Sequence, residues 1–85
     1  MTRKEVEKKV NDFLIEEIEI DEALLNDDAL LKEDLGIDSL DFVDIVVIVE
    51  NIFGFKIRPE EMTNIKTLSQ FYDYIESKSK EKKND

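Results

Sequence analysis

One serine in the segment from Asp34 to Asp41 carries the clearest chemistry in this 85-residue sequence. Ser39 follows a stretch that contains a glycine, and it stands at the expected first turn of an apolar helix. A hydroxyl there lies beside backbone N–H groups without helical partners and beside the positive end of the helix dipole, which both favour an attached phosphate. The sequence contains no cysteine and no histidine. Any covalent chemistry at Ser39 therefore needs a reactive group from another molecule.

Catalytic and metal-binding interpretations of this segment fail on their chemistry. The residues Gly36 to Leu40 are superficially similar to the Gly-Asp-Ser-Leu signature of esterases, but such enzymes activate the serine with a histidine base. The aspartates lack the alternating ligands, central glycine and terminal glutamate of an EF-hand calcium loop. We therefore expect no catalytic residue and no specific metal site in this segment. An ordinary serine at a helix start is the alternative that involves no chemistry.

The charge of the chain is strongly uneven. Residues 16–50 contain thirteen acidic residues and a single lysine, so this segment carries −12 while the whole chain carries −10. Nucleic acid is a poor partner for such a surface, because phosphates require Lys and Arg. Long-range attraction favours a basic protein partner instead. The alternative is an acidic surface that only keeps the protein in solution.

Composition predicts one small helical domain. Hydrophobic residues make up 41% of the chain, with two glycines and one proline, which is typical of a folded protein. The absence of cysteine suits a reducing compartment, and no segment has the pattern of a signal peptide or membrane span. We therefore expect a cytoplasmic protein without a membrane partner.

Local signals predict an all-α fold: a four-helix bundle with a long loop between helices 1 and 2 and a short third helix. Thr2 and Glu5 have the spacing of a capping box at the first helix. The second helix is expected from Ser39 to Ile52 or Phe53, with Asp38 as its N-cap and Gly54 after it. The third is expected from Pro59 to about Ile65, and the fourth from a capping box at Thr67 and Gln70 to about Ile75. Residues 1–76 would form the domain, and residues 77–85 a charged flexible tail.

The long loop covers residues 19–38. A short turn is expected near Asp21–Leu25, and leucines are expected to anchor the loop to the core: Leu24, Leu25, Leu30, Leu31 and Leu35.

The second helix has two apolar stripes. At 100° per residue, the core stripe contains Phe42, Ile45, Val46, Val49 and Phe53. Leu40, Val47 and Ile48 fall on the other side, among acidic residues. Because so small a bundle cannot bury both stripes, we expect the second to be exposed as a docking surface.

The segment from Asp34 to Asp41 closely resembles the phosphopantetheine attachment motif of acyl carrier proteins of the dissociated, type II fatty-acid-synthase kind. The similarity extends from the first helix through Ile57, Ile65 and Thr67 to Ile75, nearly the whole chain apart from the lysine-rich tail. The resemblance implies that a separate transferase attaches 4′-phosphopantetheine from coenzyme A to Ser39. The terminal thiol would then carry acyl intermediates as thioesters between enzymes of fatty-acid biosynthesis. The family consists of carriers, not enzymes.

The resemblance assigns two further sets of residues. One set would face basic patches on the transferase and on acyl-processing synthase enzymes: Asp38, Leu40, Asp41, Asp44, Val47 and Glu50. The other set would line a space that shelters the acyl chain: Leu31, Phe42, Val46, Val49 and Ile65. The carrier itself is expected to be a monomer.

Two positions depart from the common pattern of this family. The second helix ends with Glu50-Asn51-Ile52 instead of a run of acids, and Phe42 replaces a residue that is often small. The first change replaces charge with apolar contact, and the second either narrows the acyl space or, if the ring repacks, deepens it. A carrier dedicated to a specialised polyketide or modified-lipid pathway stays open. An unmodified acidic adaptor that binds basic proteins is the alternative from a different class.

Overall fold

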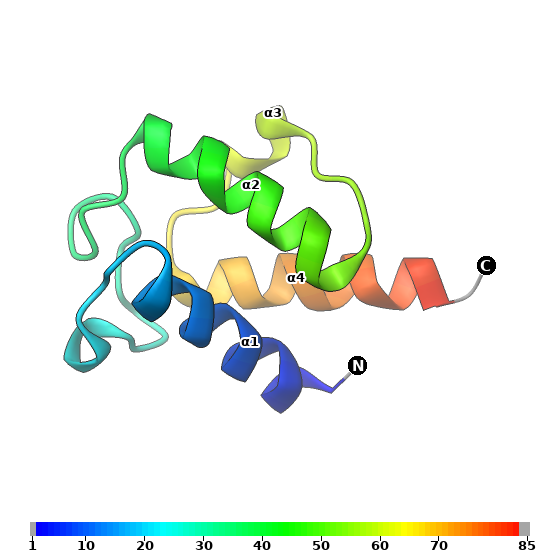
Figure 1. Ribbon diagram of the computed structural model, residues 1–85, viewed down its shortest axis with the longest axis horizontal. Coiled ribbons are helices and arrows are strands. Elements are labelled where there is room, and N and C mark those ends of the chain that lie inside the picture. Colours follow the sequence, from blue (N-terminus) through cyan, green and yellow to red (C-terminus); the bar gives the residue numbers. More distant parts are fainter. Residues whose placement is uncertain (1, 84–85) are drawn as a thin grey trace.

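The computed structural model describes residues 2–83, and all of its regular structure is helical. Its elements are α1 (Arg3–Glu16), the 3₁₀ turn η1 (Glu22–Leu24), α2 (Ser39–Phe53), α3 (Pro59–Met62) and α4 (Leu68–Lys83). The helices α1 and α4 run in opposite directions, and α2 lies across them (Figure 1). This arrangement confirms the all-α fold with a long first loop and a short third helix. Within residues 2–83, no helix has the length and apolar character needed to cross a membrane.

The helix starts follow the predicted caps. Reciprocal side-chain and backbone hydrogen bonds join Thr2 with Glu5, Asp38 with Asp41, and Thr67 with Gln70. Each pair satisfies N–H groups that a helix start leaves without partners. Gly54 ends α2 in the left-handed region, with φ 78°, which glycine adopts without the steric cost of a Cβ.

The predicted ends of the last two helices were wrong. We expected the third helix to reach about Ile65, but α3 ends at Met62. The Thr63 hydroxyl donates to the Glu60 carbonyl at 2.7 Å, and the Ile65 N–H donates to the Met62 carbonyl at 3.1 Å. These short-range bonds replace the next helical turn.

The fourth helix continues past Ile75 to Lys83. The side chains of its last part have partners: Glu76 lies 3.5 Å from Arg3 and 3.9 Å from Lys80. Pairs at i,i+4 and links to a neighbouring helix favour continuation. The flexibility of residues 77–85 stays a prediction, and Asn84 and Asp85 lie outside the described residues.

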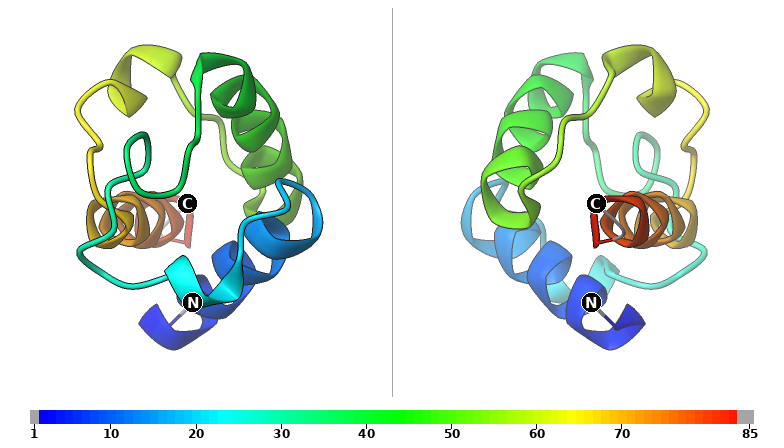
Figure 2. Two further views of the ribbon diagram at one scale, coloured as in Figure 1. Left: turned by 90° about the vertical axis from the view of Figure 1, so that its left-hand side faces the viewer. Right: turned by 90° about the vertical axis from the view of Figure 1, so that its right-hand side faces the viewer.

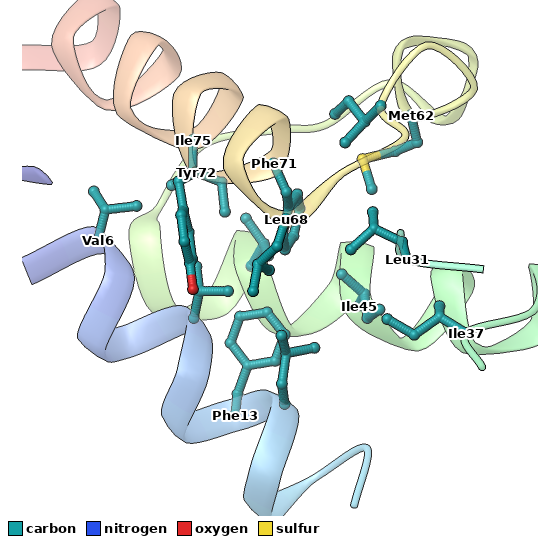
Figure 3. Close-up of a cluster of buried hydrophobic side chains, with 14 of the residues drawn as sticks. Val6, Phe13, Leu31, Ile37, Ile45, Met62, Leu68, Phe71, Tyr72 and Ile75 are labelled. Carbon is teal, nitrogen blue, oxygen red and sulfur yellow. The ribbon is translucent and has the colours of Figure 1, made fainter. Parts of the chain in front are cut away.

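The core lies between α1, α2 and α4, with the loops closing its ends (Figure 2). Figure 3 shows Val6 and Phe13 of α1 facing the side chains of α4, among them Phe71 and Tyr72. Ile45 of α2 faces the same cluster. These residues follow the 3.6-residue period read from the sequence, which explains why each helix buries one stripe.

The long loop is anchored to the chain just before and at the start of α4. The Leu31 N–H donates to the Lys66 carbonyl at 2.9 Å, and the Leu68 N–H donates to the Ala29 carbonyl at 3.0 Å. Leu31 and Leu35 are buried as expected, and so is Ile37, whereas the predicted anchors Leu24 and Leu30 are exposed. The predicted turn at Asp21–Leu25 is confirmed as η1. The loop therefore holds the start of α2 in a fixed place.

Candidate functional site

Ser39 is the first residue of α2, and its side chain is exposed. Its hydroxyl makes no hydrogen bond with any other residue in the part of the chain that the structure describes. Gly36, with φ 70°, turns the chain just before the helix. The oxygen is therefore presented to the solvent from a defined backbone position.

The first turn of α2 has both acidic groups and N–H groups without partners. The Asp41 N–H donates to Asp38 Oδ1 at 3.0 Å, and the Asp38 N–H donates to Asp41 Oδ2 at 3.2 Å. This pair leaves the N–H groups of Ser39 and Leu40 without a hydrogen-bond acceptor among residues 2–83. Free N–H groups at a helix start are suitable donors for a phosphate.

An apolar pocket of about 370 Å³ adjoins Ser39. It lies between the first half of α2 and the end of α3, two segments that run side by side in Figure 2. Its lining residues are Ser39, Phe42, Val43, Val46, Val47, Met62 and Thr63. The five α2 residues share one side of the helix, because positions three and four apart lie next to each other.

A second, smaller pocket of about 130 Å³ adjoins the first. Its lining residues are Leu31, Lys32, Glu33, Phe42, Met62, Thr63, Ile65 and Lys66. Three residues line both pockets: Phe42, Met62 and Thr63.

The five residues predicted to shelter an acyl chain divide between these spaces. Phe42 and Val46 line the pocket beside Ser39, and Leu31 and Ile65 line the smaller one with Phe42. Val49 has no exposed surface and lies in the core, away from both pockets. The structure thus brings four of the five residues to two adjoining spaces.

The predicted partner face is mostly on the surface of α2. Leu40 is 77% exposed and Val47 52% exposed, and Asp38 and Asp44 are exposed beside them. Asp41 is half-buried in the cap of the helix.

Glu50, like Asp41, is half-buried. Its Oε2 accepts a hydrogen bond from the Ile57 N–H at 3.1 Å. The carboxylate therefore holds the chain after α2 in place.

Sequence reasoning missed three residues at this site. Val43 is 62% exposed, next to Ser39 and Val47 on the helix surface, and the 100° rotation per residue already places it there. Met62 and Thr63 complete the pocket from α3. No sequence pattern around Glu60 and Glu61 predicted this role, because whether Met62 and Thr63 line the pocket depends on where α3 ends. Ile48, which was expected in the exposed stripe, is half-buried against the core.

These residues fit a covalently attached phosphate ester. They provide an adjoining apolar space, a serine oxygen and two N–H groups, and the latter three have no hydrogen-bond partner among the residues that the structure describes. Such a set suits an anion held at a helix start and an apolar group placed beside it.

Comparisons with known proteins agree with this geometry. The family model described as "Phosphopantetheine attachment site" matches residues 8–75. A relative named "Acyl carrier protein" from Thermotoga maritima is 38% identical over 77 residues, which cover 91% of this chain and 95% of the relative. A relative of the same name from Rubrobacter xylanophilus is 33% identical, over 88% of this chain and 93% of the relative. Another from Coprothermobacter proteolyticus is 34% identical, over 91% of this chain and 94% of the relative. The chain therefore belongs to the acyl carrier protein family, whose members are carriers with covalently attached 4′-phosphopantetheine rather than enzymes.

Proposed function

We propose that Ser39 is the residue that bears 4′-phosphopantetheine, and that this carrier serves enzymes of fatty-acid biosynthesis. One observation carries the proposal: an exposed serine hydroxyl, with no hydrogen-bond partner in residues 2–83, stands at the start of α2 and borders an apolar pocket. When bound, the group supplies a flexible arm whose thiol holds acyl groups as thioesters. The protein then raises the local concentration of the acyl group at each enzyme.

Attachment at Ser39 is a phosphoryl transfer. The Ser39 oxygen attacks the phosphorus of coenzyme A that bears the pantetheine, and a new P–O bond forms. The P–O–P bridge of coenzyme A breaks, and adenosine 3′,5′-bisphosphate leaves. The hydroxyl proton would pass to a base on the transferase, because the carboxylates of Asp38 and Asp41 beside Ser39 already accept hydrogen bonds in the cap of α2. The N–H groups of Ser39 and Leu40 would then stabilise the anionic diester.

The partner face supports binding to enzymes with basic patches. Asp38 and Asp44 lie beside the exposed Leu40 and Val47, so carboxylates border an apolar strip. Such a strip supplies area for contact, while the carboxylates attract and orient a basic partner. We further infer a monomeric carrier in the cytoplasm, where enzymes of this kind would meet it.

Mass spectrometry of the intact protein tests the attachment site. After incubation with coenzyme A and a broad-specificity phosphopantetheinyl transferase, the wild type should gain the mass of one phosphopantetheinyl group. Ser39→Ala should gain nothing. Ser77→Ala is the matched control, because Ser77 is also exposed but lies on α4, and it should gain the same mass as the wild type. An unmodified wild type, alongside a known carrier that the same transferase modifies, would overturn the proposal.

A carrier dedicated to a specialised polyketide or modified-lipid pathway is the second candidate. Ile52 is 39% exposed at the end of α2, where the sequence departs from the run of acids expected of a fatty-acid carrier. An apolar side chain there selects a different partner surface from a carboxylate. The mass of the acyl group carried in the native host separates the two pathways: an unmodified saturated chain supports the first, and a functionalised chain supports the second.

A further inference from the structure

Phe42 lies at the boundary between the two pockets. It lines the space of about 370 Å³ beside Ser39 and also the space of about 130 Å³ beyond it. Only the first pocket includes Ser39, and only the second includes Leu31 and Ile65. An apolar chain that enters beside Ser39 therefore meets Phe42 before it reaches the second space.

We propose that Phe42 determines the length of the acyl chain that this carrier shelters, by closing the pocket beside Ser39 against the smaller one. The inference rests on the proposed function of Ser39. Methylene groups that fit in the first pocket leave water, and those beyond its capacity stay in contact with water. The buried apolar area of the acyl chain therefore stops increasing at a chain length that the position of Phe42 determines.

The other two boundary residues are less able to set this limit. Met62 has an unbranched, flexible side chain that adapts its shape to its neighbours. Thr63 is exposed, and its hydroxyl is bound to the Glu60 carbonyl at 2.7 Å. Phe42 belongs to the capped first part of α2 and has a rigid ring, so its position defines a fixed end for the pocket.

The second pocket offers a suitable space once the ring is removed. Leu31 and Ile65 are 2% and 8% exposed and form its apolar side. Lys32, Glu33 and Lys66 form its outer side and are exposed. A chain that passes position 42 would therefore continue along apolar side chains while the charged groups stay in water.

The test measures how well each chain length is protected. Wild type and Phe42→Ala are loaded from a series of acyl coenzyme A donors, from butanoyl to hexadecanoyl, and the rate of thioester cleavage by hydroxylamine is measured. In the wild type, cleavage should slow with chain length and then become constant. In Phe42→Ala, slowing should continue to longer chains, by up to about fourfold for each further methylene group that is buried.

Two further variants make this test specific. Phe55→Ala removes the same ring from a half-buried position that lines neither pocket, so the chain length at which the rate becomes constant should stay as in the wild type. Adding Ile65→Phe to Phe42→Ala fills the second pocket and should return that chain length to the wild-type value. If Phe42→Ala fails to fold by circular dichroism, Phe42→Leu is used, with a smaller shift in the same direction.

The outcomes separate this inference from the proposed function. If folded Phe42 variants are loaded but keep the wild-type dependence on chain length, Phe42 does not set the limit. If cleavage continues to slow at longer chain lengths in the double variant, the acyl chain does not enter the second pocket. Absence of loading in wild type and variants alike would instead contradict the role of Ser39.

Discussion

The Tyr74 hydroxyl donates a hydrogen bond to Glu61 Oε1 at 2.7 Å and so connects α4 to α3. Lys78 Nζ lies 3.6 Å from the same oxygen and 5.8 Å from the centre of the Tyr74 ring. Glu61 immediately precedes Met62, which lines both pockets. The contact between Tyr74 and Glu61 therefore holds one side of the pocket beside Ser39 in place.

Acid should weaken this connection. The hydrogen bond from Tyr74, followed by the charge of Lys78, lowers the pKa of Glu61 below its ordinary 4.5. A lowered pKa in the folded state adds stability that is present above the unfolded value and lost as the pH falls through the folded value. Tyr74→Phe should therefore lower the free energy of unfolding at neutral pH, and the difference from the wild type should shrink below about pH 4.5. Urea unfolding at a series of pH values measures the loss of stability at neutral pH and its decrease in acid.

Tyr72→Phe is the control for that experiment. The Tyr72 hydroxyl donates to Asn11, whose amide does not titrate. This variant should lose about 1 kcal/mol of stability, and the loss should be the same at acidic and neutral pH. If Tyr74→Phe also loses the same stability at every pH, Glu61 does not act through its charge.

Tyr72 should ionise later than an ordinary tyrosine. Its side chain is 3% exposed, and burial raises its pKa from 10.0 to about 12, although the hydrogen bond to Asn11 opposes this. The stability from the neutral hydroxyl is present below the unfolded pKa and is lost as the pH rises through the folded value. The difference between the ultraviolet titrations of wild type and Tyr72→Phe should have its midpoint near pH 12. A midpoint near 10 would mean that the hydroxyl is in contact with water.

Local signals predicted the helix starts correctly because a cap depends on residues three positions apart. Thr2 with Glu5 and Thr67 with Gln70 are such pairs. The predicted end of α3 was wrong. The helix ends where the Thr63 hydroxyl donates a hydrogen bond to the Glu60 carbonyl, and this bond competes closely with one more helical turn.

The site could be predicted where it depends on residue types and on their positions within one helix. Ser39 and the exposed Leu40 follow from the start of α2 and its period. The period of α2 placed Val49 in the core stripe correctly. How α2 packs against α3 is a tertiary property, so the sequence did not show that Val43 lines a pocket or that Val49 lies away from it. The side of the pocket supplied by Met62 depends on packing between segments far apart in the chain.

Charge reversal at Asp44 should slow modification without loss of the fold. Asp44 is exposed on α2, so Asp44→Lys should change stability by less than about 1 kcal/mol. The transferase should act on it with a kcat/KM at least about tenfold lower, since like charges oppose docking. Asp28→Lys makes the same charge change at an exposed position in the long loop and should have a smaller effect. Equal effects of the two would indicate general attraction without a defined face. Asp41→Lys is a less clean variant, because Asp41 also caps α2.

Substitutions at two positions with positive φ should change the stability of the protein in opposite directions. Gly36 has φ 70°, and an added Cβ would meet nothing within 4 Å, so Gly36→Ala should cost about 1–2 kcal/mol from backbone strain alone. Glu19 has φ 64° without being glycine. Glu19→Gly should raise stability by less than about 1 kcal/mol, because relief of strain exceeds the extra freedom of glycine in the unfolded chain. Urea unfolding measures both changes, and a clash at residue 36 would appear as a much larger loss.

Added salt should stabilise this protein. Residues 16–50 carry −12, and carboxylates held close together in the folded state repel one another more than in the expanded chain. Salt screens this repulsion over a distance of about 10 Å at 0.1 M, so the melting temperature should rise from low to moderate salt. Among residues 2–83, no group of three or more acidic side chains is placed to hold a metal ion. The rise should follow ionic strength gradually, because screening acts on all the charges of the segment together. Asp27→Asn combined with Asp28→Asn should reduce the rise, since less charge remains to be screened. A melting temperature independent of salt would show that self-repulsion is not a significant cost for this fold.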